Sequence, residues 1–500
     1  MHPVIAALAR HAARRPSQVA LTDGARRIDH VTVYRLVREV AAALACRRPA
    51  AVAIAMDNTP AWLVLDLACL GARIPCVPVP GFFSALQQTH LIADAGVELL
   101  ITDRPDFHTE LLAPLGIAGT AVEREVAGTR LTQFRLQRAQ RSCLPHGTAK
   151  VTYTSGTTGS PKGVCLDGAA LAQVAQSLAT ACGLQTEDRH VSLLPLSTLL
   201  ENVAVYAALL AGATCCVPSL TQIGLPVATG FDCERMVRQL ALHRATTAIT
   251  TPQMAHGAIE VLERGTVRLD SPRFLAVGGA VVPAVLLDRA AALGLPLYQG
   301  YGLTECASVV ALNTPQHNRS GSVGRPLPHA CVSIAEDGEV LVEGAVPLGY
   351  AGSNAAIPAA WPTGDVGHMK DGYLYITGRR RNIFITSFGR NIAPEWVEGE
   401  LTCMPAIRQV WVYGEGRPWN TAVITPSPGT TRAQIDAAIE CVNARLPAYA
   451  RISAWLESEQ PFSFSNGELT ANGRLRRDTL LAHYFRPIER VYKETTADVS

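Results

Sequence analysis

Short apolar segments alternate with amphipathic ones along most of the chain. Residues 51–55, 76–79 and 99–102 are typical of buried strands, and residues 61–70 and 90–95 between them are typical of helices. The alternation returns further along, with helices expected over 169–182, 201–210, 233–243 and 285–293 and strands over 191–194, 213–217, 248–251 and 274–277. This βαβα order predicts an α/β fold in which helices cover mostly parallel sheets.

The pattern changes after Gly378, where a shorter α+β arrangement runs to the end of the chain. A chain of 500 residues is also too long for one hydrophobic core. We therefore expect a large N-terminal domain over residues 1–380 and a small, mobile α+β C-terminal domain over residues 381–500. Three consecutive arginines, Arg379, Arg380 and Arg381, lie at the junction.

Composition narrows the class of protein. A net charge of +2 gives no electrostatic footprint for nucleic acid, so no nucleic-acid partner is expected. The 13 cysteines are scattered without a Cys-x-x-Cys pair, which favours reduced thiols and a cytoplasmic location and gives no structural zinc site. The uncharged stretch 202–231 is interrupted by Gly212 and Pro218, and arginines break the apolar N-terminal segment, so neither a membrane span nor an export signal is expected.

The segment TYTSGTTGSPKGVCLDG (residues 152–168) is too rich in glycine and hydroxyls for a helix. Glycines let backbone N–H groups approach an anion, the hydroxyls add donors, and Lys162 adds a mobile positive charge. Pro161 before this lysine and Gly163 after it exclude a Walker loop. Strand-like residues on both sides predict a phosphate-binding connection between two strands, although most Ser/Thr/Gly loops bind nothing.

Four further segments carry polar side chains in unusual contexts: YQGYGLTE (298–305), WPTGDVG (361–367), GRRRNIFITSFGRNIAPE (378–395) and LTANGRLRR (469–477). Alone, each would be explained as a turn, a helix cap or packing. In this order, together with the first loop, they resemble the adenylate-forming (AMP-binding) superfamily of acyl-CoA synthetases, adenylation domains and luciferases. The segments TSFGRNIAP and LPLS (194–197) are most similar to the long-chain acyl-CoA synthetase branch.

The resemblance implies a two-step reaction. A carboxylate attacks the α-phosphorus of ATP and expels pyrophosphate, and the acyl-adenylate then passes its acyl group to a thiol. Such a step depends on positioning and charge neutralisation more than on covalent work by the protein. ATP and Mg²⁺ are the implied cofactors, and the implied partners are a carboxylic acid and, as acceptor, CoA or an acyl carrier protein.

The resemblance also gives each motif residue an expected place. Lys162 and the loop would hold the β- and γ-phosphates, Thr304 the α-phosphate, and Thr154 and Glu305 the Mg²⁺. Asp365 and Arg379 would bind the ribose hydroxyls. Tyr301 would stack on adenine beside the Gly278, Gly279 and Ala280 backbone. The expected nucleotide-binding residues are Thr154, Ser155, Gly156, Thr157, Thr158, Gly159, Gly278, Gly279, Ala280, Gln299, Gly300, Tyr301, Gly302, Asp365 and Arg379, and the expected catalytic ones are Lys162, Thr304, Glu305 and Arg474.

Two departures from the family pattern bear on chemistry. Arg474 stands where relatives carry a catalytic lysine, so a planar guanidinium would have to bridge carboxylate and phosphate. Leu196 stands where amino-acid-activating relatives carry an aspartate, so a substrate ammonium would lack a partner. The second departure favours an apolar acid, aliphatic or fatty, between the segments 199–210 and 250–256.

Three functions remain open from the sequence. The first is an AMP-forming ligase that joins an acid to a thiol. The second is adenylation of a hydroxy acid followed by internal ring closure to a lactone. The third, raised by Arg474, is a protein that binds nucleotide or acyl-adenylate without catalysis.

Overall fold

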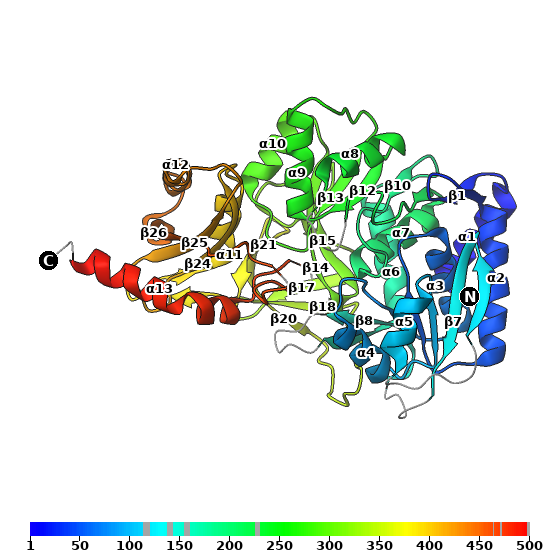
Figure 1. The fold of residues 1–500 in the computed structure, drawn as a ribbon. Coiled ribbons are helices and arrows are strands. Elements are labelled where there is room, and N and C mark those ends of the chain that lie inside the picture. The colour runs from blue at the N-terminus through cyan, green and yellow to red at the C-terminus, as the bar shows by residue number, and fades with distance from the viewer. Residues whose placement is uncertain are drawn as a thin grey trace.

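The computed structural model describes residues 1–113, 121–137, 144–154, 161–225, 231–463, 465–470 and 473–497. A large body holds the N-terminal part of the chain, and a smaller body, which ends in the long helix α13 (Arg477–Ala497), lies beside it (Figure 1). No helix in these ranges is long and apolar enough to cross a membrane. The α/β fold with a large N-terminal and a small C-terminal part is therefore confirmed.

The first extended sheet of the large body has the strand order β16-β15-β14-β13-β12-β10-β11-β1-β2 among the described residues. Neighbours are parallel from β1 to β14, and the antiparallel strands β2, β15 and β16 lie at the two ends. The strands are β1 (Val19–Thr22), β2 (Arg27–Asp29), β10 (Arg189–Val191), β11 (Thr214–Cys216), β12 (Thr247–Thr250), β13 (Phe274–Val277), β14 (Leu297–Leu303), β15 (Ser308–Leu312) and β16 (Arg325–Pro326).

The second sheet has the order β19-β9-β8-β4-β3-β5-β7-β6. Its centre is parallel, whereas β8 and β9 pair antiparallel on either side of the glycine-rich segment. The strands are β3 (Val52–Ala55), β4 (Cys76–Pro78), β5 (Leu99–Thr102), β6 (Val122–Val126), β7 (Thr129–Arg135), β8 (Thr148–Thr154), β9 (Lys162–Asp167) and β19 (Gly349–Tyr350). The expected strand on each side of the phosphate loop is thus present.

Two helices fill the space between these sheets. Every residue of α3 (Pro60–Ala72) up to Leu70 is buried, and so is every residue of α7 (Leu199–Ala211) up to Leu209 except the half-buried Leu200. A helix that is apolar all round must be covered on all sides, which is why these two lie between layers. Their core cluster joins Ile54 of the second sheet to Leu21 of the first. As expected, α7 ends at Gly212, whose φ of 78° only glycine adopts without strain.

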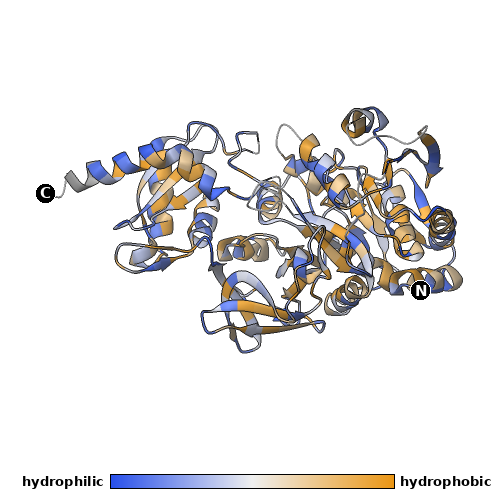
Figure 2. Cartoon of the chain, turned by 90° about the horizontal axis from the view of Figure 1, so that it is seen from below, coloured by the Kyte–Doolittle hydropathy of each residue, from blue (hydrophilic) through white to orange (hydrophobic). Residues whose placement is uncertain are grey.

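Other helices cover the outer faces of the two sheets, and Figure 2 shows the hydrophobic residues concentrated on the strands and inner helix faces. These outer helices are α4 (Ala85–Asp94), α5 (Pro105–Leu112), α8 (Cys233–Leu242), α9 (Pro252–Glu263) and α10 (Ala284–Ala292). The helices α1 (Pro3–Arg14), α2 (His30–Arg47) and α6 (Gly168–Ala181) pack instead in the same core cluster as α3 and α7.

A four-stranded antiparallel sheet follows the large sheets in the chain, in the order β17-β18-β20-β21. It comprises β17 (Ala330–Ile334), β18 (Glu339–Gly344), β20 (Trp361–Lys370) and β21 (Tyr373–Arg379). The small body then packs α11 (Pro394–Thr402) and α12 (Arg432–Asn443) on the sheet of β24 (Ile407–Tyr413), β25 (Asn420–Pro426) and β26 (Ile452–Glu457), with a short hairpin of β22 (Phe384–Ile385) and β23 (Asn391–Ile392).

Burial of His30 at the start of α2 makes stability depend on pH. The side chain is fully buried, and burial, followed by the neighbouring His11, lowers the pKa of His30 to about 4. Protonation therefore disfavours the folded state, and the stability present above pH 6.5 is lost as the pH falls toward 4.

We predict that His30→Phe removes the loss of stability at acid pH that arises from protonation of His30. Between pH 6.5 and pH 4 the variant should lose about 3 kcal/mol less unfolding free energy than the wild-type protein, because one pKa unit corresponds to about 1.4 kcal/mol. Urea unfolding at a series of pH values measures the difference. If the unfolding free energy of the two proteins fell equally with pH, His30 would not be a source of the acid sensitivity.

Candidate active site

A glycine-rich backbone edge forms where β13 ends. A side chain on Gly278 would meet the carbonyl oxygen of Gly300 at 2.9 Å, so the two strands approach too closely for any other residue. Gly279 has a φ of +83° and open space where a side chain would lie. Gly279 and Ala280 are both exposed. The predicted Gly278–Ala280 wall therefore faces solvent at Gly279 and Ala280, while Gly278 is buried, and it lies at the carboxyl end of a parallel strand, where ligands of α/β folds commonly bind.

The neighbouring strand β14 carries Gln299, Gly300, Tyr301 and Gly302, and a short 3₁₀ turn, η2 (Thr304–Cys306), follows it. A side chain on Gly302 would lie 1.7 Å from the carbonyl oxygen of Ser308, so only glycine permits the tight pairing of β14 with β15. That pairing places Thr304 and Glu305 at the turn between the two strands.

Asp365 joins the antiparallel sheet to β14. One carboxylate oxygen accepts a hydrogen bond from the Tyr301 hydroxyl at 2.7 Å, and the other lies 2.9 Å from Nε of Arg379. Asp365 is buried, and burial, followed by the Asp365 charge, raises the pKa of Tyr301 above its ordinary value. The three side chains that sequence analysis assigned to the adenosine moiety therefore form one connected group.

Glu305 lies beside the end of the second sheet. The Tyr350 hydroxyl donates to Oε1 of Glu305 at 3.2 Å, and burial, followed by the Glu305 charge, raises the pKa of Tyr350. Tyr350 is in β19, which pairs with β9, and β9 also contacts η2. Lys162 begins β9 opposite Thr154 and is exposed. Of the remaining loop residues, Ser155, Gly156, Thr157, Thr158 and Gly159 lie outside the described residues.

Arg474 reaches from the small body to the large one. One of its terminal nitrogens donates to the carbonyl oxygen of Gly279 at 2.8 Å. Desolvation of the guanidinium lowers the pKa of Arg474, the charges of Arg379 and Arg381 lower it further, and Asp365 and Glu305 raise it. Although the residue as a whole is exposed, its charged head therefore lies among the other predicted site residues.

The loop around Arg474 is held by a buried ion pair that sequence analysis missed. Arg477 donates to both carboxylate oxygens of Glu398 on α11, at 2.8 and 2.6 Å. Glu398 also accepts the Val412 N–H at 2.9 Å, and burial raises its pKa despite the Arg477 charge. The backbone N–H of Arg474 itself donates to the Thr470 hydroxyl at 3.1 Å. Arg477 is therefore a structural anchor of this loop.

The segment that precedes α7 is held from both sides. Asn58 donates to the Leu194 carbonyl at 2.9 Å and accepts the Leu196 N–H at 2.8 Å. Glu201 accepts the Leu194 N–H at 3.2 Å and lies 3.0 Å from Nε2 of His190. All of these residues are buried. Their polarity within apolar sequence was the only signal that could have identified Asn58, His190 and Glu201 as a fixed support for the expected acid-binding segment.

On the other side of that expected pocket, His256 lies on α9. Its Nε2 is 3.3 Å from a terminal nitrogen of Arg289, and its Nδ1 is 3.6 Å from Glu260. Burial lowers the pKa of His256. Met254 and Ala255, immediately before His256, are buried in the core cluster of β10, β12 and β13. The start of α9 therefore carries both buried apolar side chains and the polar group of His256, Glu260 and Arg289.

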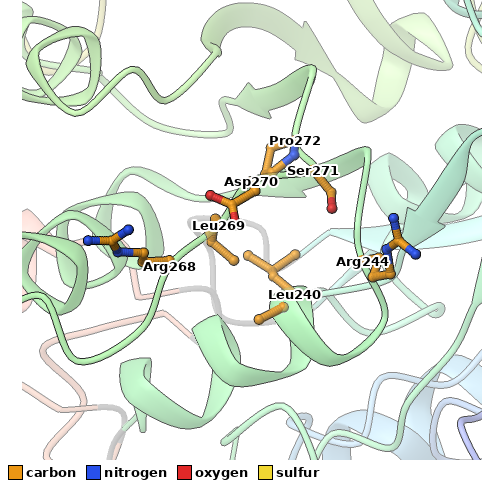
Figure 3. A pocket seen from close by; sticks show the side chains of 8 residues that line it. Leu240, Arg244, Arg268, Leu269, Asp270, Ser271 and Pro272 are labelled. Atoms are coloured by element: carbon orange, nitrogen blue, oxygen red, sulfur yellow. The ribbon is translucent and has the colours of Figure 1, made fainter.

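A shallow pocket of about 230 Å³ lies elsewhere (Figure 3). It is lined by Leu240 and Arg244 next to α8 and by Arg268, Leu269 and Pro272 before β13. These residues precede β12 and β13, so the pocket is at the amino ends of the strands, opposite Gly278. In Figure 3 the two arginine heads point apart, so they do not converge on one ligand.

Comparison with known proteins places this site in context. A family model described as AMP-binding enzyme matches residues 8–350, and one described as AMP-binding enzyme C-terminal domain matches residues 381–496. Feruloyl-CoA synthase of Amycolatopsis sp is 30% identical, with 88% of this chain and 92% of that protein covered. Long-chain-fatty-acid–CoA ligase FadD15 of Mycobacterium bovis is 25% identical, with 87% of this chain and 86% of that protein covered.

A solved structure shares the fold. O-succinylbenzoate coenzyme A synthetase (MenE) from Bacillus subtilis, in complex with ATP and magnesium ion, superimposes with a TM-score of 0.73 at 22% identity. The match covers 94% of this chain and 98% of that one. Both bodies therefore have counterparts in one known architecture.

We predict that Arg477→Met destabilises the small body by about 3 kcal/mol, because it leaves the buried Glu398 carboxylate without its partner. Arg476→Met is the matched control, since no ion pair of the Arg476 side chain occurs within the described ranges, and it should change stability little. Urea unfolding, with hydrogen exchange in β24 and β25, measures both. Equal effects of the two substitutions would show that the pair is not the anchor.

Proposed function

The chain belongs to the AMP-binding enzyme family, and we propose that it activates a carboxylic acid with ATP to an acyl-adenylate and transfers the acyl group to the thiol of CoA. Membership supports an adenylate-forming acid–CoA ligase. The observation that carries the assignment of the site is the bond from Arg474 to Gly279, which brings the small-body cation into the group of Asp365, Arg379 and Glu305.

We assign the adenosine moiety to the edge formed by β13 and β14. Gly278 and Gly279 have no side chain, and Gly279 and Ala280 are exposed, so a flat base can lie against this edge. The hydrogen bond to Asp365 fixes the Tyr301 ring for stacking on that base. Asp365 and Arg379 offer an acceptor and donors to the ribose hydroxyls. Gln299, Gly300 and Gly302 shape the strand that carries Tyr301.

We assign the triphosphate to the region between η2 and β9. Glu305 supplies a carboxylate suited to Mg²⁺, which prefers oxygen ligands, and Thr154 supplies a hydroxyl from the opposite sheet. When bound, Mg²⁺ would neutralise phosphate charge. Thr304 would contact the α-phosphate, and Lys162 with residues 155–159 would hold the departing pyrophosphate. Arg474 would bridge the acid carboxylate and the α-phosphate, since a guanidinium forks between two oxygens.

For the acid we propose an aliphatic or fatty substrate. Leu196 is buried at the position where a partner for an ammonium would be needed, and the walls on α7 and α9 are mostly apolar. Relatives of similar sequence identity are named for fatty acids and for aromatic acids, so the choice of an aliphatic acid rests on Leu196 and on these apolar walls. An acyl carrier protein is the alternative acceptor, and we propose a cytoplasmic location.

We also propose that the bodies meet between residues 380 and 381, and that the small body turns there between the two half-reactions. Arg381 follows the end of β21 and is exposed, so its backbone can change direction without disturbing a core.

The decisive experiment mixes the protein with ATP, Mg²⁺ and a panel of fatty, aromatic and hydroxy acids and measures pyrophosphate release, then adds CoA. Acid-dependent release followed by thioester formation supports the ligase. Release followed by a lactone without a thiol supports ring closure. No release with any acid, combined with binding of acyl-adenylate, would support a non-catalytic binding protein.

We predict that Asp365→Asn weakens ATP binding at least about tenfold, because the variant loses a charge-assisted pair with Arg379 and leaves its donors unmatched. Asp337→Asn, which alters an exposed pair with Arg380, is the control and should bind ATP normally. Calorimetric titration with ATP measures both. Unchanged affinity in Asp365→Asn would remove the residue from the nucleotide site.

We predict that Arg474→Ala slows acid-dependent ATP–pyrophosphate exchange by about a hundredfold, as expected when a group that stabilises transition-state charge is lost. Acyl transfer to CoA from a pre-made acyl-adenylate should change far less. Arg476→Ala is the control, and Arg474→Lys should retain substantial exchange. Loss of both half-reactions, or of neither, would contradict the role of Arg474 in adenylation.

A further inference from the structure

A cluster of polar side chains lies deep between the two large sheets, away from the site. Lys150 on β8 donates to Asp66 of α3 at 2.6 Å, to Tyr206 of α7 at 3.0 Å, and to the side-chain oxygen of Asn202. Asp66 also accepts from Asn202 at 2.9 Å and from Tyr206 at 2.5 Å. All four side chains are fully buried or within 1% of it. The proposed reaction assigns none of them a role.

The cluster satisfies its own polar groups. All three ammonium protons of Lys150 have an acceptor, and both oxygens of Asp66 have a donor. The ammonium also lies 5.7 and 5.1 Å from the ring centroids of Trp62 and Tyr206. Removing a charge pair from water costs several kcal/mol, so burial is tolerated only with such complete pairing. Apolar packing would tolerate a small slide of one helix, whereas these directional bonds allow one arrangement.

The elements held by this cluster lead to the two halves of the proposed site. β8 continues from Lys150 to Thr154, which pairs with Lys162 at the start of β9. α7, which is the expected acid-binding segment 199–210, also places Glu201, next to Asn202, against the Leu194 N–H of the segment that precedes it. The bonds within the cluster therefore connect the strand that leads into the phosphate loop with the helix that positions the acid.

The polar cluster and the apolar core contact different faces of α7. Asn202 and Tyr206 are four residues apart and share one face of the helix. Leu200 and Ala204 lie on the opposite face, where they pack against the core cluster on the side of β10 and β12. The polar cluster thus contacts α7 on the face of Asn202 and Tyr206 and does not reach the opposite face.

We propose that Lys150, Asp66, Asn202 and Tyr206 form a positioning network that sets the distance between the end of β8 at Thr154 and the acid-binding helix α7, and thereby the rate of adenylation. This inference rests on the proposed function. It concerns the attack of the carboxylate on the α-phosphorus, where displacements of about 1 Å are known to cost about a hundredfold in rate.

The test uses the double variant Lys150→Met/Asp66→Leu, in which both charges are replaced by apolar groups. Replacing both charges avoids leaving one buried charge without its partner, so the double variant should be less destabilised than either single variant, Lys150→Met or Asp66→Leu. In the double variant we expect kcat for pyrophosphate exchange to fall at least about tenfold while KM for ATP changes by less than about threefold. If the network had only a structural role, kcat of the double variant would recover together with its stability.

A milder variant and a control complete the experiment. Tyr206→Phe keeps the packing and removes one hydroxyl with its two hydrogen bonds, to Lys150 and Asp66, and its kcat should fall about threefold with unchanged KM. Arg273→Met breaks the pair with Asp188, which ties other segments, and should lower stability while leaving kcat unchanged. Should the double variant fail to fold, Tyr206→Phe decides the question by the same split of kcat and KM.

The outcomes separate the two proposals. If the wild-type enzyme is active and the folded double variant has a normal kcat, the positioning network alone is overturned. The same holds if the double variant does not fold and the Tyr206→Phe variant has a normal kcat. A wild-type protein that releases no pyrophosphate with any acid overturns the proposed function, and the inference falls with it.

Discussion

The two large sheets share a single layer of buried helices, and the position of every other element depends on that layer. α3 and α7 are apolar on nearly all sides, so each must be covered by both sheets at once. This constraint brings the end of β8, from the second sheet, toward the ends of β13 and β14, from the first. The candidate site is built where these ends meet, with residues from both sheets and the small body.

The βαβα alternation was enough to predict the fold, because the period of apolar residues identifies strands and helices locally. The resemblance assigned Asp365, Arg379 and Tyr301 to the nucleotide, and the structure connects these three side chains in one group. The contacts that fix the parts relative to one another could not be predicted this way. Lys150 and Asn202 lie 52 positions apart, and Arg474 and Gly279 lie 195 positions apart, so no local pattern links them.

Arginine residues near the C-terminus show the same limit in one short segment. Sequence analysis assigned a role to Arg474 alone among the three arginines of residues 474–477. In the structure the three differ, because Arg477 pairs with a buried carboxylate, Arg474 crosses to the large body, and Arg476 has a backbone bond to Glu468. Identical side chains in one run thus take different roles according to the direction in which the loop turns, which depends on α11 rather than on the run itself.

The guanidinium of Arg474 has a chemical consequence of its own. A lysine amine held beside a mixed anhydride is a nucleophile whenever it loses its proton, and it can capture the acyl group of the intermediate that it helped to form. Arginine keeps its proton under all ordinary conditions and is a poor nucleophile. In the proposed reaction, the cation closest to the activated acid is therefore one that its own product cannot acylate, so the enzyme is protected at this position from self-inactivation.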